Sequence, residues 1–212
     1  MQKRVLVACE YSATVREAFK AKGWDAWSCD LLETEIEGQH YQCDIKEVLY
    51  NQHWDLLCAF PPCTYLCASG MHWTTRGLRE PQLTEDAIAF VKLLMDAPIA
   101  HILIENPVGC ISSRISKPDC IIQPWQFGHP ESKKTCLWLN NLPLLRPTNV
   151  LALPESGRWS NQTANGQNKL APSKDRWKIR SRTYQGIADA IADQYTTALS
   201  TTSSTGDQYS PA

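Results

Sequence analysis

Short apolar runs alternate with amphipathic segments through the first half of this chain, and this alternation most limits what the chain can fold into. Four short, predominantly apolar runs have the composition of buried strands: 4–9, 25–29, 54–60 and 101–104. Residues 12–23 and 81–97 carry apolar residues at helical spacing. Strands alternating with helices predict an α/β fold with a doubly wound, mostly parallel sheet, whose ligands bind at the carboxyl ends of the strands.

The second half of the chain gives weaker signals. Residues 135–139 predict a late strand, and residues 184–199 predict a final amphipathic helix. The stretch 143–174 is rich in Pro, Asn, Gly and Ser and predicts one long surface connection. We therefore expect a single domain over residues 1–195, with a basic loop region at 140–179. The remaining Ser/Thr-rich segment, 196–212, predicts a disordered tail.

Composition indicates a cytosolic, soluble protein. No stretch approaches the roughly 18 consecutive apolar residues of a membrane span, and the first residues lack the apolar run of a signal peptide. The nine cysteines are scattered, and several lie inside apolar runs, as reduced thiols do. Cys58, Cys63 and Cys67 have no Cys-x-x-Cys spacing, so we expect no metal site.

The net charge of −1 hides an asymmetry along the chain. Residues 112–182 hold 12 Lys and Arg against 4 Asp and Glu, whereas the rest of the chain holds 9 against 18. A basic half on a nearly neutral protein favours a face that binds polyanions. A solvated basic surface without a partner is the alternative.

Two motifs follow predicted strands. Pro61 and Pro62 end one strand and restrict the backbone just before Cys63, which fixes a thiol in the crevice above the sheet. Glu105 and Asn106 follow another strand. Because parallel strands can end side by side, we expect the thiol and the carboxyl group to face one substrate. The alternatives are a buried thiol, and an acid that forms an ion pair or caps a helix.

These motifs, in this order after a Rossmann-like start, resemble the C5-cytosine DNA methyltransferase family, most closely its short phage-encoded members. In that family a Pro-Cys at a strand end supplies the nucleophile, and a Glu-Asn at the next strand end binds the base. The resemblance spans roughly residues 3–195. It implies a class I methyltransferase fold, S-adenosylmethionine as cofactor, DNA containing cytosine as partner, and the host cytoplasm as location if a phage encodes the chain.

The resemblance also implies roles for individual residues. It makes Cys63 and Glu105 the catalytic residues. It places the cofactor against the loop after the first strand, two strand-end acids and the segment near residue 186, with these contacts: Ala8, Cys9, Glu10, Tyr11, Ser12, Asp30, Asp44, Ile45, Pro61 and Gly186. It places the substrate against these residues: Pro62, Asn106, Lys133, Lys134, Arg180 and Arg182.

The implied chemistry follows from the low nucleophilicity of cytosine C5. A thiolate from Cys63 adds to C6, and the Glu105 carboxyl group assists at N3, so that C5 can accept a methyl group. The base must leave the duplex stack to be reached.

Two departures from the family keep other interpretations open. The first loop has Ala13 where the family keeps glycines, and only about forty residues, roughly 138–179, stand in place of a separate target-recognition domain. This stretch is basic and contains Trp159 and Trp177, which either stack on unpaired bases or pin a surface loop. The alternatives are methylation of RNA or a free nucleotide, and a catalytically silent module that binds S-adenosylmethionine or nucleic acid.

Overall fold

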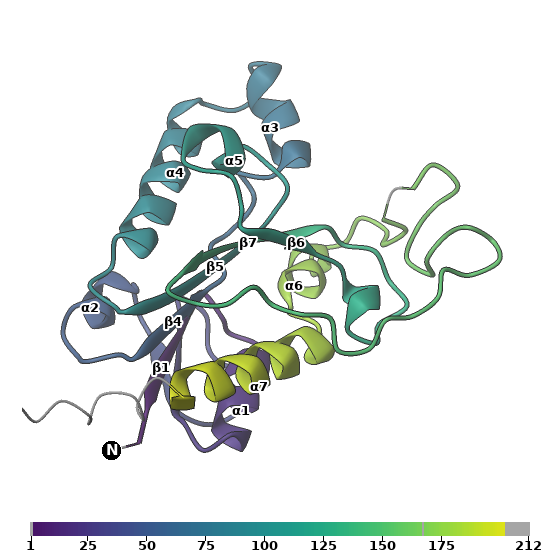
Figure 1. Ribbon diagram of the computed structural model, residues 1–212. Helices are drawn as coiled ribbons and strands as arrows, with labels where there is room; N and C mark the ends of the chain where they lie inside the picture. The colour runs from purple at the N-terminus through teal and green to yellow at the C-terminus, as the bar shows by residue number, and fades with distance from the viewer. Residues whose placement is uncertain (1, 167, 202–212) are drawn as a thin grey trace, which may run out of the picture.

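The chain folds around one seven-stranded sheet, as a computed structural model shows for residues 2–166 and 168–201 (Figure 1). The strands are β1 (Arg4–Ala8), β2 (Asp25–Asp30), β3 (His40–Gln42), β4 (Leu56–Ala59), β5 (His101–Pro107), β6 (Cys120–Ile122) and β7 (Thr135–Asn140). Their order is β3-β2-β1-β4-β5-β7-β6; β1 to β5 are parallel, and β7 is antiparallel to both of its neighbours. This is a Rossmann-like, doubly wound and mostly parallel sheet, and it confirms the predicted α/β fold class.

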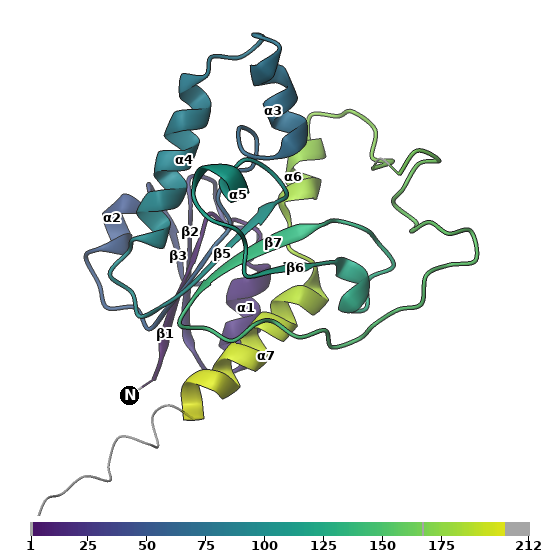
Figure 2. The same cartoon turned by 45° about the horizontal axis from the view of Figure 1, so that its top comes forward.

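Helices cover both faces of the sheet. Helices α1 (Thr14–Ala21) and α7 (Gln185–Thr201) pack together on one face, and α2 (Lys46–Leu49) and α4 (Gln82–Met95) lie on the other (Figure 1). A 3₁₀ turn, η1 (Pro124–Gln126), follows β6. Helices α3 (Ala68–Thr75), α5 (Ile111–Arg114) and α6 (Arg176–Ser181) lie toward the carboxyl ends of the parallel strands (Figure 2). That end of the sheet is where this class of fold binds ligands.

Burial on both faces explains why the central strands are continuous apolar runs. In β1 the side chains of Val5 and Val7 join the cluster beneath α1 and α7, whereas Leu6 and Ala8 join the cluster beneath α2 and α4. All four are inaccessible to solvent. Successive side chains of a strand point to opposite faces, so a strand covered twice needs apolar residues at every position.

The structure corrects the expected end of the domain. Helix α7 continues to Thr201, so residues 196–201 belong to this helix and not to a tail. The rest of the predicted tail, 202–212, lies outside the described residues. The stretch 143–174 contains no helix or strand in its described residues, and helix α6 occupies the end of the predicted basic loop region.

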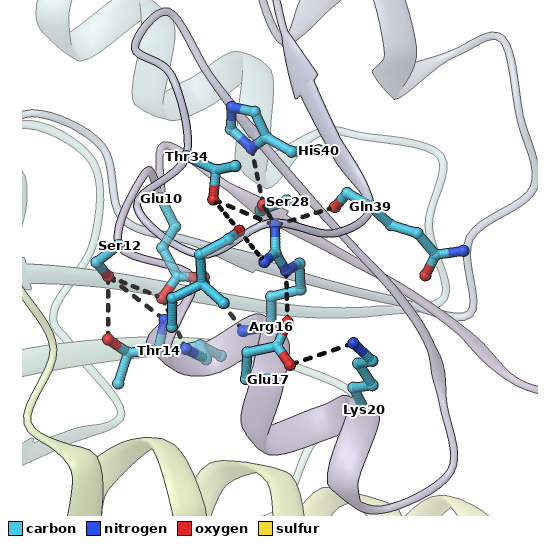
Figure 3. A network of polar contacts seen from close by, with 12 residues as sticks. Glu10, Ser12, Thr14, Arg16, Glu17, Lys20, Ser28, Thr34, Gln39 and His40 are labelled. Atoms are coloured by element: carbon cyan, nitrogen blue, oxygen red, sulfur yellow. Dashed lines mark hydrogen bonds and ion pairs between the residues drawn. The ribbon is translucent and has the colours of Figure 1, made fainter.

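A buried arginine holds the connection between β2 and β3. The Arg16 side chain on α1 is fully buried, and its guanidinium donates to the Ser28 hydroxyl at 3.1 Å and to the Ile36 carbonyl at 2.6 Å (Figure 3). Its Nε contacts the Glu17 carboxylate at 3.0 Å. A buried charge persists only where its hydrogen bonds are satisfied. Arg16 therefore fixes the loop 31–39 against α1.

We predict that Arg16→Met lowers the free energy of unfolding by about 3 to 5 kcal/mol, because it leaves buried acceptors and an acid without their partner. Urea unfolding followed by circular dichroism measures this loss. The control is Lys20→Met on the same helix, an exposed residue paired with the same acid, which we expect to change stability by less than about 1 kcal/mol. Equal, small losses in both variants would contradict the structural role given to Arg16.

Candidate active site

A hydrogen bond joins the ends of β4 and β5. The two strands are neighbours, with Ala59 opposite Ile104. Beyond these residues, the Asn106 side-chain amide donates to the Pro61 carbonyl at 2.7 Å, and both residues are buried. The structure thereby places the turn that carries Cys63 beside the strand end that carries Glu105. Asn106 is fully buried and its side-chain amide supports the turn; its expected role against the substrate stays a prediction.

The charges of three side chains act on one another at this edge. The half-buried Glu105 carboxyl group has a raised pKa because burial disfavours its ionised form; Lys133 and a hydrogen bond from Thr135 oppose the shift. The pKa of the Cys63 thiol is raised, first by its hydrogen bond with Cys67 and by burial, and also by the charge of Glu105, while Lys133 lowers it. The structure therefore brings the predicted thiol and acid together and adds a cation to them.

Two of the predicted basic residues belong to this cluster. The Lys133 ammonium group donates to the Arg180 carbonyl at 3.0 Å and lies 6.0 Å from the centre of the Tyr184 ring. The positive charge of Arg180 acts on Cys67. Lys134 and Pro62 are exposed beside the cluster.

A hollow lies beside the loop that follows β1. Its volume is about 30 Å³, and it is lined by Cys9, Glu10, Tyr11, Ser12, Phe60, Ser181, Arg182 and Thr183. The Arg182 guanidinium forms an ion pair with Glu35 at 2.5 Å. Arg182 thus lies at the expected cofactor loop, where its guanidinium is paired with Glu35; its expected contact with the substrate stays a prediction.

Two strand-end acids approach the same loop. The pKa of the Cys9 thiol is raised mainly by burial. The negative charge of Asp30 raises it further, and that of Asp44 adds a smaller contribution. Carboxylates in this position suit the hydroxyl and amine donors of a nucleoside, so the donor set fits S-adenosylmethionine.

The backbone of this loop is strained. Cys9 and Ala13 have φ values of 59° and 61°, in the left-handed region that favours glycine. Both residues lie in the loop after β1, where members of the C5-cytosine methyltransferase family, which the sequence resembles, have glycines. Non-glycine residues in this conformation cost about 1 to 3 kcal/mol each and gather at functional sites.

The Glu10 side chain binds the backbone at the start of helix α1. Its carboxylate accepts hydrogen bonds from the backbone N–H groups of Val15 at 2.7 Å and Arg16 at 3.2 Å, at the first turn of the helix. Burial raises the pKa of this carboxyl group from its usual 4.5 to about 7, although these N–H groups oppose the shift. The side chain therefore caps the first turn of the helix, and Glu10 also lines the hollow.

We predict that Glu10 makes the protein less stable as pH rises from about 5 to about 8. A carboxyl group with a raised folded-state pKa binds its proton more tightly in the folded state, so its contribution is complete below the unfolded pKa and is lost as pH passes about 7. The loss amounts to roughly 3 kcal/mol. Urea unfolding across this pH range should show a decrease for the wild type that Glu10→Gln lacks. Parallel curves for the two proteins would disprove this.

Three further predicted cofactor contacts do not line this hollow. Ala8 and Ile45 are buried in the core beneath α2 and α4. Gly186 packs against the turn after η1: its N–H donates to His129 Nε2 at 2.9 Å, and a Cβ there would lie 2.0 Å from the Phe127 carbonyl oxygen. Gly186 is therefore required by close packing of α7 and does not line the hollow.

Sequence reasoning missed Glu35 and Cys67. Glu35 follows β2 in a loop without periodicity, and its pairing with Arg182 depends on the anchoring of this loop by Arg16 and by the bond from the Glu35 N–H to the Tyr11 carbonyl at 2.8 Å. Cys67 lies four residues after Cys63, a spacing that places two side chains on one face of a helical turn. This four-residue spacing is the feature of the sequence from which the closeness of Cys67 to Cys63 could have been predicted.

Comparison with known proteins finds likeness in structure but not in sequence. No protein-family model matches the chain, and no curated protein matches it. A crystal structure of a candidate DNA modification methyltransferase encoded within a prophage (E. coli) is similar, with a TM-score of 0.48 and 14% sequence identity. The match covers 72% of this chain and 53% of that one, so this chain corresponds to about half of that protein.

Neither a membrane span nor a metal centre is found in the described part of the chain. None of the helices within residues 2–166 and 168–201 has the length and apolar character needed to cross a membrane. Among the same residues, no three His, Cys, Asp or Glu side chains are grouped so as to hold a metal ion.

Proposed function

We propose that this protein is a DNA methyltransferase that transfers a methyl group to C5 of cytosine through Cys63, with Glu105 as the assisting acid. The observation that carries the proposal is that this thiol and this acid follow adjacent strands at the carboxyl end of the sheet, close enough that the charges of Glu105 and Lys133 both act on Cys63. The strand-end acids Asp30 and Asp44 beside the β1 loop support a nucleoside-bearing cofactor next to them.

Each group in the cluster has a chemical task. Cys63 supplies the sulfur that bonds to cytosine C6, and the positive charge of Lys133 favours its thiolate form. The raised pKa of Glu105 keeps its carboxyl group protonated nearer to neutral pH, so that it can donate a proton to N3 and stabilise the enamine. Bound S-adenosylmethionine would supply the electrophilic methyl group, held near Cys9, Asp30 and Asp44.

Basic and aromatic side chains near the cluster support a nucleic-acid substrate. Lys134 and Arg180 are exposed, and Trp177 on α6 is 53% exposed. These residues suit phosphate contacts and stacking on a base that has left the helix stack. Trp159 has another role, because it is buried and stacks on Trp125 at 5.8 Å between ring centres, which pins the loop.

Unpaired cytosine, in a single strand or as a free nucleotide, is the second candidate substrate. The stretch 143–174 forms no helix or strand in its described residues. It is tied to a neighbouring turn, where Asn161 and Ser132 exchange hydrogen bonds of 2.9 and 3.0 Å. A tethered loop of this kind offers little surface for reading a duplex sequence.

We predict that Cys63→Ala abolishes methyl transfer from labelled S-adenosylmethionine and that Glu105→Gln slows it by about 10² to 10⁴-fold. The assay compares duplex DNA, single-stranded DNA and dCMP as acceptors, which also separates the two candidate substrates. Cys120→Ala on β6 is the matched control, since it removes a half-buried thiol outside the cluster. Unchanged transfer by folded Cys63→Ala would refute the proposal.

A further inference from the structure

The turn after Cys63 places a second thiol beside it. The backbone N–H groups of Leu66 and Cys67 both donate to the Cys63 carbonyl, at 3.0 and 2.9 Å, which forms one helical turn. Residues four apart on such a turn share a face. The two thiols therefore lie on one face of this turn, and both are half-buried and free of disulfides.

Close backbone contact fixes this turn against the loop after β5. Cys67 pairs with Gly109 in an isolated β-bridge, and the Cys110 N–H donates to the Leu66 carbonyl at 2.8 Å. A Cβ at Gly109 would lie 2.0 Å from the Leu66 carbonyl oxygen and 2.7 Å from the Cys67 Cα, so only glycine permits the approach. The position of Cys67 is therefore set relative to Glu105, four residues before Gly109 on the same segment.

The surroundings of the two sulfur atoms differ. Cys67 Sγ lies 3.3 Å from the Ser69 hydroxyl, and the backbone N–H of Gly70 and the positive charge of Arg180 also act on it. This sulfur and the neighbouring thiol of Cys110 also act on each other.

Cys63, in contrast, faces the carboxyl group of Glu105 as well as the ammonium group of Lys133. A carboxylate repels a neighbouring thiolate, whereas hydrogen-bond donors and a guanidinium attract one. Negative charge is therefore better stabilised at Cys67 than at Cys63.

We propose that Cys67 is a positioning residue that holds the proton of the nucleophile: the two thiols share one proton, and Cys67 accepts it when Cys63 attacks. In this step the S–H bond of Cys63 breaks, an S–H bond forms on Cys67, and the electron pair left on Cys63 bonds to the base. When the thiol is expelled, the proton returns. The inference rests on the proposed function for the attack itself, but the proton sharing exists without substrate.

Proton sharing changes how the pair titrates. The pKa of Cys67 is lowered, chiefly by its hydrogen bond with Cys63 and further by Ser69, Gly70 and Arg180, while that of Cys63 is raised. The pair should therefore lose its first proton at a lower pH than an isolated thiol does, and its second at a higher pH.

Alkylation by iodoacetamide tests this directly in the full-length protein. We expect wild-type labelling at Cys63 and Cys67, located by peptide mass spectrometry after reduction, to begin roughly one pH unit or more below that of Cys63 in Cys67→Ala. Cys67→Ser should show the same upward shift, because serine keeps a hydrogen-bond donor but cannot hold the negative charge. Circular dichroism confirms that both variants are folded.

The outcomes separate this inference from the proposed function. An unchanged Cys63 labelling profile in both folded variants would overturn the proton sharing, whether or not the protein transfers methyl groups. A shifted profile in a protein without methyl transfer would support the shared proton and refute the proposed reaction. Cys63→Ala should in turn raise the labelling pH of Cys67, since each thiol depends on the other; labelling of Cys67 at the wild-type pH would count against the pair.

Discussion

The hydrogen bond from the Asn106 amide to the Pro61 carbonyl is the interaction on which the site depends. It is buried and joins the segments that leave two adjacent strands, so it sets the distance between the thiol of Cys63 and the carboxyl group of Glu105. Loss of one partner in such a bond costs about 1 to 3 kcal/mol, because the remaining group stays buried and unsatisfied. The two prolines then leave the turn little freedom to place the thiol anywhere else.

A second chain of contacts governs the neighbouring hollow. Arg16 anchors the loop 31–39 through the Ile36 carbonyl, and Glu35 in that loop pairs with Arg182 across the loop after β1. The Tyr11 hydroxyl adds a bond to the Lys178 carbonyl at 2.9 Å. The segment from α6 to residue 183 is therefore held against the loop after β1 by side-chain contacts from several distant segments.

The sequence was sufficient for the parts of the fold that are governed by burial. The strands β1, β4 and β5 are apolar runs in the sequence because both of their faces are covered. Once these strands were predicted, the motifs at the ends of β4 and β5 could be located from them. Short elements such as β3, β6 and α6 were missed, since three to six residues show no clear period.

Placement of the basic residues could not be deduced in the same way. Lys133 reaches the thiol and the acid because β7 runs antiparallel beside β5, whereas Arg182, two residues after Arg180, turns to Glu35. The backbone of Gly186 is used for packing, and the side chains of Ala8 and Ile45 are in the core. These assignments depend on contacts between distant segments, which a pattern in one sequence does not contain.

The most direct measurement is mass spectrometry of nucleosides from DNA that has been co-expressed with the protein in a host without its own cytosine methyltransferases. This measurement identifies the methylated atom of the base and shows that DNA is the polymer that carries it. We predict 5-methylcytosine in DNA from cells with the wild type and none in DNA from cells with Cys63→Ala. Methylation at another atom, such as N4 of cytosine or N6 of adenine, or 5-methylcytosine that persists without the Cys63 thiol, would contradict the central claim.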